Sequence, residues 1–580
     1  MNRIYKVIYS KARQCAMVVS ELAKSSHKNS RKGAGHVGTP ALARIVAAAL
    51  AAGALTWGIA PGVSWAAETA GNKAGAGIGI AIGENSKTDK FAPNQIAIGV
   101  GAMDKSDDSA PNDAAIAIGA GAHTYNELGR RVATISFGKA QKDYTGGIAI
   151  GTKTYAITGG TSIGQRDYNG VMGDVTVSDE NRDYLQYAPG ATSLGSNAYA
   201  GGTLATVIGA YNISSSGYNG KGGLNSAYYV AQNLGSTILG TLNTNESSQA
   251  PDVGSNFNIF TGKGTIKSSS SGIANSIVGV ANTVKNSNGS IVLGAGNTVS
   301  NSSTKIVDDI TGSPSELINW QPTSYKSVND MAQDLRDKVK SSKSGGSTLV
   351  IGGGNTADYT QRTQIIGVNN TVTGTEEKPS DYNMVNAFGT EVTNSSHLYT
   401  IGDNNHITDT NKTIVFGDNR YVSTTNDSII IGSSDKSDKP QYTTATDATI
   451  IGHNANAWGN RSMALGKEVY TTGDDSVAIG SAVAAYSKNS IAIGSSDGFY
   501  KTAVTDYSKE KPTEGGIAIG MGTLTNASHG TAIGYHAMVT NVDGYALGSK
   551  ASVSADRGGS YWLSGTRYKC GECTGFGHEG

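Results

Sequence analysis

Two cysteines near the end of the chain have the spacing closest to a metal or redox motif. Cys570 and Cys573 enclose two residues, as in zinc-binding and dithiol–disulfide sites. A structural zinc ion takes four ligands, and His578 would supply only a third. The remaining cysteine, Cys15, lies at the other end of the chain. We therefore expect an accidental pair and no metal site.

Other catalytic patterns are missing from the sequence. The nine histidines are scattered and form no His-x-x-x-His pair with a glutamate, and there is no phosphate-binding loop or nucleophile elbow. The segment 352–358 resembles one calcium-binding nonapeptide, but such sites need stacked copies. We expect no enzyme activity and no cofactor.

The most regular feature is a tetrapeptide of three small or apolar residues followed by Gly. It reads Ile-Ala-Ile-Gly at 80–83 and again at 491–494, with about two dozen variants between Gly83 and Gly548. In the cleanest run, the glycines recur every 14 residues from Gly452 to Gly494. A fixed period of this kind decides the architecture of the chain.

Fourteen residues accommodate two short strands and two tight turns. In 491–493 the two Ile side chains fall on one face of a strand and Ala492 on the other. Residues 483–486 are predicted to form the second strand, and 487–490 the turn back. Stacked coils of this kind form an all-β parallel β-roll solenoid of roughly 14-residue repeats.

One such chain has too little apolar area to order its own coils. Burial of two Ile side chains per coil stabilises the fold by less than the backbone entropy lost in ordering the coil. The remaining apolar face is therefore expected to pack against other copies of the chain.

Charge divides the chain at about residue 66. Residues 1–66 are basic with one acid, Glu21, and the remainder is net acidic, which argues against nucleic-acid binding. An apolar stretch at 41–60 ends before Ser64 and Ala66, a plausible signal-peptidase site, although a transmembrane anchor is the alternative. We assign 1–66 as an extended signal peptide.

The opening residues 1–10, Met-Asn-Arg-Ile-Tyr-Lys-Val-Ile-Tyr-Ser, resemble the extended signal peptide region of type V secreted proteins. The repeats, typified by Asn489 to Gly494, resemble the head repeats of YadA-like trimeric autotransporter adhesins, over most of 70–552. This resemblance implies a left-handed β-roll, three chains to a head, export by the Sec route and display on the outer surface of a Gram-negative bacterium. It also implies binding to host matrix, host cells or other bacteria, with autoagglutination and biofilm formation.

Members of this family continue into a coiled-coil stalk and a membrane-anchoring barrel. We find no sustained heptads and no terminal set of alternating strands here. The repeats are expected to end near Asp556, and 557–580 has a different character. Our hypothesis is a truncated or frameshifted product, which would be secreted or periplasmic if it has no anchor.

Long gaps between repeat glycines predict insertions. The largest separates head repeats at 67–300 from those at 348–556, and within this 301–347 insertion residues 327–340 have the apolar spacing and N-terminal capping pattern of a helix. It is either a surface excursion or an element that contacts a ligand. Two further gaps, 165–194 and 210–239, are rich in Tyr, which offers amphipathic contact area or simply suits exposed strands.

Candidate ligand-contact residues come from these two patterns. They are Asn489, Ser490, Ile491, Ala492, Ile493, Gly494, Tyr184, Tyr187, Tyr228 and Tyr229. The first six are similar to the family's collagen-associated motif, but Ile491 and Asp497 depart from it, so collagen binding is not implied.

We therefore interpret the chain as a non-enzymatic, homotrimeric adhesin head. One alternative is a β-solenoid enzyme acting on polysaccharide, which would need a cluster of carboxylates at one level of the stack. The other is a purely structural or ice-binding solenoid; ice binding would need a flat Thr array, which Ile-Ala-Ile strands do not provide.

Overall fold

A computed structural model describes most of the repeat region and little of the leader. The described residues are 5–10, 15–20, 79–88, 95–106, 115–126, 147–157, 160–169, 190–202, 204–216, 233, 235–247, 272–302, 329, 332–333, 348–436, 440–496, 498, 502–504, 514–554, 557–563 and 566–570. The chain divides into two compact units, Met1–Ala67 and Glu68–Gly580.

The first unit contains one hairpin. β1 (Tyr5–Ser10) pairs with β2 (Cys15–Ser20) in antiparallel register. No helix within the described part of the chain combines the length and apolar character needed to cross a membrane.

The second unit is built on one long parallel ladder, which we call the first sheet. Its strands carry the repeated tetrapeptide, and each pairs with the next in the following order: β3 (Ile80–Ile82), β4 (Ile96–Ile98), β6 (Ile116–Ile118), β8 (Ile148–Thr152), β10 (Thr161–Gln165), β12 (Thr192–Ser196), β14 (Thr206–Ala210), β16 (Thr237–Thr241), β18 (Ser276–Val280), β20 (Ile291–Ala295), β22 (Leu349–Gly353), β25 (Gln364–Val368), β28 (Met384–Phe388), β30 (Tyr399–Ile401), β32 (Ile414–Phe416), β34 (Ile429–Ile431), β35 (Thr449–Ile451), β37 (Met463–Lys467), β39 (Val477–Ser481), β41 (Ile491–Ser495), β43 (Ile517–Met521), β45 (Thr531–Ile533), β47 (Tyr545–Leu547) and β49 (Gly559–Leu563).

Two shorter parallel ladders close the coils on the opposite side. The second sheet contains β5 (Met103–Ser106), β7 (His123–Asn126), β9 (Tyr155–Ile157), β11 (Tyr168–Asn169), β13 (Tyr199–Ala200), β15 (Ile213–Ser216), β17 (Thr244–Ser247), β19 (Thr283–Lys285), β21 (Thr298–Ser300), β23 (Thr356–Asp358), β26 (Thr371–Thr373), β29 (Glu391–Thr393), β31 (His406–Thr408) and β33 (Tyr421–Ser423). The third sheet contains β36 (Asn456–Ala457), β38 (Tyr470–Thr471), β40 (Val483–Ala485), β42 (Thr502–Val504), β44 (Leu524–Thr525), β46 (Met538–Val539) and β48 (Ser552–Val553). A small pair, β24 (Thr360–Gln361) with β27 (Ser380–Asp381), lies at a corner.

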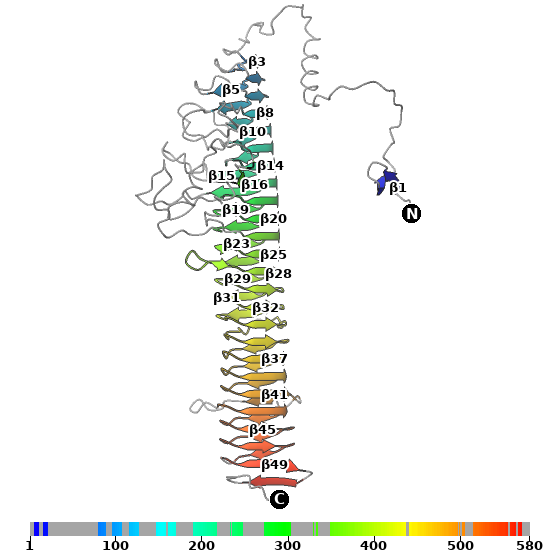
Figure 1. The fold of residues 1–580 in the computed structure, drawn as a ribbon, viewed down its shortest axis with the longest axis vertical. Coiled ribbons are helices and arrows are strands. Elements are labelled where there is room, and N and C mark those ends of the chain that lie inside the picture. Colours follow the sequence, from blue (N-terminus) through cyan, green and yellow to red (C-terminus); the bar gives the residue numbers. More distant parts are fainter. Residues whose placement is uncertain are drawn as a thin grey trace, which may run out of the picture. The chain divides into compact units, whose positions relative to one another are not determined.

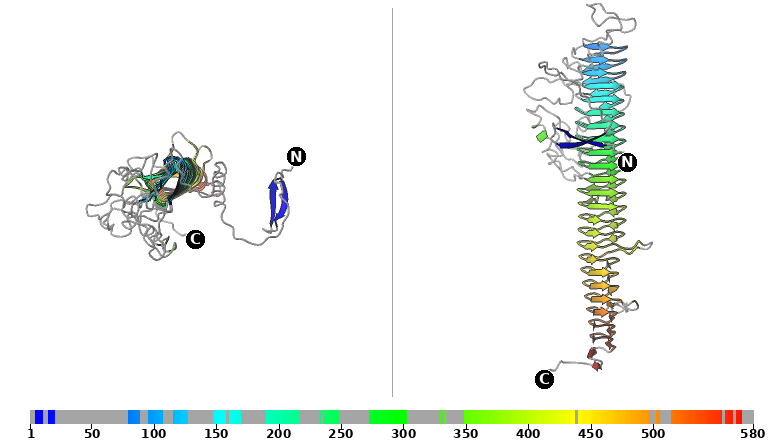
Figure 2. Two further views of the ribbon diagram at one scale, coloured as in Figure 1. Left: turned by 90° about the horizontal axis from the view of Figure 1, so that it is seen from above. Right: turned by 90° about the vertical axis from the view of Figure 1, so that its right-hand side faces the viewer.

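Figure 1 shows these coils stacked along the second unit, and Figure 2 shows the same strands superposed along the stack. The all-β parallel solenoid predicted from the tetrapeptide is confirmed, and β40 forms within the predicted second strand at 483–486. The first sheet continues across the predicted interruptions. Gly164 pairs with Gly195, and Gly294 pairs with Gly352, across 31 and 58 residues of sequence.

The middle residue of each tetrapeptide faces into the coil. In β41 the side chain of Ala492 is fully buried, whereas Ile491 and Ile493 on either side are half-buried. Ala, Val or Ile fills this inward position in most strands, including Ile238, Ile365 and Ile430, and buried Ser162, Ser193 and Thr400 fill it in β10, β12 and β30. The paired Ile side chains that we expected to be buried therefore lie on the outer face of their own chain, because the interior between two sheets of one narrow coil accommodates a single inward side chain per strand.

The repeat glycines form a column in which most positions have a backbone conformation and a close approach that only glycine allows. Gly352 has φ of +133°, and a Cβ built on it would lie 1.8 Å from the carbonyl oxygen of Gly367 in the next coil. Gly466 has the same relation to Gly480, at φ +127° and 1.8 Å. Only glycine combines this backbone conformation with so close an approach. Ala387 takes this place in β28, where its φ is not positive.

Three residues after each of several repeat glycines, a fully buried Asn joins a second column. It contains Asn212, Asn243, Asn282, Asn297, Asn355 and Asn370. Asn297 Nδ2 donates to Asn282 Oδ1 at 3.0 Å and to the carbonyl of Gly352 at 2.9 Å, and Asn282 Oδ1 also accepts the backbone N–H of Asn297. Each amide is thereby satisfied inside the coil, which offsets the cost of burying it.

The column begins with a carboxyl group and ends with a guanidinium. Asp167 Oδ2 accepts from Gly195 N at 2.7 Å and Oδ1 from Ala198 N at 2.9 Å. Burial raises the pKa of Asp167 above its usual value, and these two hydrogen bonds only partly oppose that rise.

Arg420 lies where the second sheet ends. Its Nη1 donates to Ala455 O at 2.6 Å and its Nη2 to Gly452 O at 2.8 Å, and its Nε donates to Gly432 O. Burial lowers the pKa of Arg420 to about 10, so the guanidinium remains charged at neutral pH. Between β33 and β36, the described second-sheet pairing is the single bridge of Val422 with Thr443.

One sequence expectation has a different outcome, and another falls mostly outside the described residues. β49 (Gly559–Leu563) continues the first sheet beyond Asp556, where the repeats were expected to end, and β50 (Thr566–Cys570) then pairs with β49 in antiparallel register. In the predicted helix, positions 329, 332 and 333 are helical, and the rest of 327–340 lies outside the described residues.

We predict that Gly352→Ala destabilises the fold by about 2 kcal/mol or more, because Ala must adopt a strained φ and its Cβ meets the carbonyl of Gly367. Gly353→Ala is the matched control, because its φ is not in the left-handed region and the nearest atom to its Cβ would be 3.6 Å away. Urea unfolding midpoints measure both variants. Equal effects of the two substitutions would contradict the proposed constraint.

We also predict that Asp167→Asn increases stability at pH 7. The folded state raises the pKa of Asp167, so it binds more protons than the unfolded state and loses stability as pH rises through the folded pKa. Asn keeps an acceptor and has no charge to desolvate, so its advantage should shrink as pH falls toward the unfolded pKa of about 4. A stability difference between the two proteins that is independent of pH would refute this explanation.

Candidate interaction surfaces

The outer face of the first sheet carries a continuous apolar column, which we call the apolar seam. It consists of the residue before each repeat glycine, in register from coil to coil: Ile82, Ile98, Ile118, Ile150, Ile163, Leu194, Ile208, Leu239, Val278, Leu293, Ile351, Ile366, Asn386, Ile401, Phe416, Ile431, Ile451, Leu465, Ile479, Ile493, Ile519, Ile533 and Leu547. Leu239 is 46% exposed and Ile451 41%. An exposed apolar strip of this extent marks an interaction surface.

A neighbouring column on the same face is mixed. It contains the residue three before each repeat glycine, and is apolar at Ile96, Ile148 and Ile517. In the coils from β10 to β18, hydroxyl side chains replace the apolar ones. These are Thr161, Thr192, Thr206, Thr237 and Ser276. The apolar seam is therefore the more uniform of the two columns.

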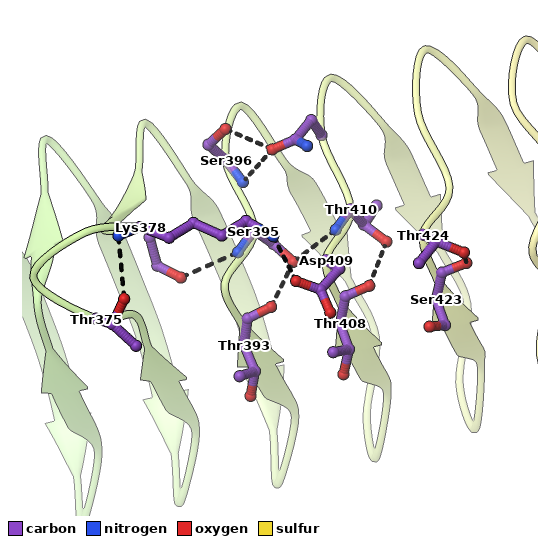
Figure 3. A network of polar contacts seen from close by, with 12 residues as sticks. Thr375, Lys378, Thr393, Ser395, Ser396, Thr408, Asp409, Thr410, Ser423 and Thr424 are labelled. Carbon is purple, nitrogen blue, oxygen red and sulfur yellow. Dashed lines mark hydrogen bonds and ion pairs between the residues drawn. The ribbon is translucent and has the colours of Figure 1, made fainter.

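The second sheet presents a polar outer face. Thr393, Thr408 and Ser423 follow one another in register on β29, β31 and β33, and Figure 3 shows them in line on successive coils. Beside them, Lys378 from the preceding loop pairs with Asp409. Hydroxyl and charged groups of this kind suit a solvated surface or polar contacts with a partner.

Aromatic and imidazole rings stack along the same side. His406 and Tyr421 are stacked with 4.6 Å between ring centroids, and Glu391 Oε2 lies 3.4 Å from His406 Nε2. At a corner, Tyr382 stacks on His397 at 4.7 Å, with Arg362 over the Tyr382 ring at 5.0 Å. Partly exposed tyrosines in such stacks provide rigid contact area.

Residues five places before the repeat glycine positions have positive φ and lie above one another at a corner of the coils, and we call them the corner column. Charged side chains occupy this column in the later coils. Arg461 donates to both oxygens of Asp475, at 2.7 and 2.9 Å, and this hydrogen bonding lowers the pKa of the Asp475 carboxyl. His529 Nδ1 lies 3.2 Å from Asp543 Oδ1. Because the pairs link one coil to the next on an exposed surface, each contributes little to stability.

The structure separates the sequence-predicted contact residues. Asn489 is exposed at the corner and donates to Glu514 Oε1 at 2.7 Å. Ser490 and Ala492 are fully buried in the coil, while Ile491 and Ile493 belong to the outer face of the first sheet. Gly494 belongs to the glycine column. Tyr184, Tyr187, Tyr228 and Tyr229 lie outside the described residues.

The sequence reasoning expected an apolar face that packs against other copies but did not identify the seam residues as that face, and it missed the corner column. The alternation of the tetrapeptide was a signal for the seam, and the positive-φ corner residues have no shared side-chain type that could have revealed them. Cys570 ends β50, and Cys573 and His578 lie outside the described residues. Within the described ranges, no group of three or more His, Cys, Asp or Glu side chains could hold a metal ion.

Comparison with known proteins identifies the leader. Residues 1–50 match the family described as Extended Signal Peptide of Type V secretion system. The N-terminus therefore carries an extended signal peptide of the kind used in type V secretion, which agrees with the sequence interpretation of this segment. No curated protein matches the chain.

Proposed function

We propose that residues 67–556 form the head of a surface adhesin in which three copies of the chain pack together through their apolar seams. The observation that carries this proposal is the seam itself: an uncharged apolar strip that runs through the first sheet and is left half-exposed by the chain's own fold. Burial of such side chains stabilises an assembly by roughly 1–2 kcal/mol each.

The seam favours further copies of the same chain as its partner. An occupant must present an apolar strip of the same length, spacing and twist, and another copy of the same solenoid does so by construction. The expectation that three chains assemble, and that their coils are left-handed, comes from the resemblance to YadA-like heads. The type V leader supports export toward a Gram-negative cell surface.

We propose attachment to host matrix proteins, host cells or other bacteria as the function of this head, without catalysis. In the trimer, the second and third sheets and the corners would face outward. Their repeated hydroxyl, charged and aromatic groups would offer many weak contacts, whose combined avidity exceeds that of any single contact. Autoagglutination and biofilm formation would follow when the partner is another cell of the same kind.

The trimer is tested by placing charges in the seam. We predict that Leu239→Lys combined with Ile451→Lys yields monomers of lower thermal stability, because buried unpaired ammonium groups are costly. The control is Leu242→Lys with Val542→Lys, since these side chains are 55% and 45% exposed but lie outside the seam. Light scattering gives the mass of each protein. A wild-type chain that is a stable monomer would refute the trimer.

Adhesion is tested with the same variants. Wild-type protein should bind immobilised matrix proteins or cultured cells, and the monomeric seam variant should bind at least about 100-fold more weakly, because avidity is lost. The off-seam control should bind as wild type does. Equal binding by monomer and trimer would contradict multivalent attachment, and binding to none of these surfaces would contradict the adhesin function.

A further inference from the structure

A periodic seam does not define its own register. Each coil presents nearly the same side chain to its partner, so a copy displaced by one coil would lose the contacts of one level and keep the others. In sheets, register is held where some position differs from its neighbours in polarity. A chain that assembles through such a seam therefore needs at least one residue that breaks the pattern.

Asn386 is the residue that breaks the apolar pattern of the seam. It lies in register with Ile366 on the preceding strand and Ile401 on the following one, and it is the polar member of a column that is otherwise apolar from Ile82 to Leu547 within the described strands. Its side chain is exposed on the outer face, as are those of its apolar neighbours in the seam.

The coil that carries Asn386 differs in other ways. Ala387 replaces the repeat glycine, and Phe388 follows with 58% of its surface exposed. Phe388 N donates to Asp403 Oδ1 at 2.9 Å, which ties this coil to the next. The irregularity is thus confined to one level of the stack and is held there by the fold.

An amide in an apolar interface needs a partner of its own kind. Left unpaired, a buried amide loses its hydrogen bonds to water and gains none in return, which destabilises the interface. In register, the Asn386 side chains of neighbouring copies reach the same level and can each donate and accept. If one copy is displaced by any number of coils, each Asn386 side chain faces Ile, Leu, Val or Phe instead. The hydroxyl residues from Thr161 to Ser276 in the neighbouring column distinguish one register from another less well, because a shift of one coil changes the contacts only at the two ends of that run.

We propose that Asn386 sets the register in which copies of this chain assemble. The inference rests on the proposed packing of copies through the apolar seam and adds the residue that selects one alignment. A single polar residue fixes the register of a coiled coil by the same physical means, at some cost in stability.

The test measures alignment separately from assembly. The exported chain, with the substitutions Cys570→Ser and Cys573→Ser, carries one nitroxide label on Lys467→Cys, where the lysine side chain is 64% exposed. Pulsed dipolar spectroscopy should give one narrow distance between copies. With Asn386→Ile, which installs the residue found on both neighbouring strands, the mass should be unchanged, but the distance distribution should broaden toward longer values, because some copies are displaced along the stack by multiples of the coil rise of about 4.8 Å.

A second variant moves the polar level by one coil. Asn386→Ile combined with Ile366→Asn should restore a single narrow distance. If Asn386→Ile keeps one narrow distance, the register role is wrong, while the assembly through the seam stands. If the wild-type chain is monomeric by light scattering, the assembly is wrong and the register role falls with it.

Discussion

The approach of one repeat glycine to the next is the constraint on which the solenoid depends. The carbonyl oxygen of Gly367 lies where a Cβ on Gly352 would be, and the same carbonyl accepts a hydrogen bond from Asn355 Nδ2 at 2.8 Å. The glycine column and the buried asparagine column are therefore two parts of one arrangement. Glycine lets the coils approach, and the amide three residues later satisfies the carbonyl that this approach buries.

This arrangement determines what each face of the first sheet can do. Inside the narrow coil most first-sheet strands place a single side chain, such as Ala492 in β41 or Ile365 in β25. The larger side chains on either side are forced outward, so a coil that is well packed internally still exposes apolar area. The internal packing of one chain and its tendency to associate have the same geometric origin.

Much of the fold could be predicted from the sequence because the tetrapeptide has strand periodicity and a fixed spacing. Alternation placed Ile491 and Ile493 on one face and Ala492 on the other, but it could not say which face was inside. That depends on the width of the coil, which the second strand sets. Asn297 and its equivalents were visible three residues after glycine, yet their role needs the carbonyl of the next coil. The reach of Arg420 across two coils, and the burial of Ser490 within a predicted contact motif, follow only from tertiary packing.

The joint at Arg420 affects how the solenoid would respond to force. Hydrogen bonds between parallel coils run along the stack, so tension applied along it pulls directly on them. Near residue 430, the first sheet runs on from β34 to β35, while on the opposite side the β-pairing between described residues is the bridge of Val422 with Thr443, to which side chains such as Arg420 add hydrogen bonds. The guanidinium of Arg420 therefore adds three donors that resist tension at the level where the second sheet ends and the third begins, while the first sheet continues through it.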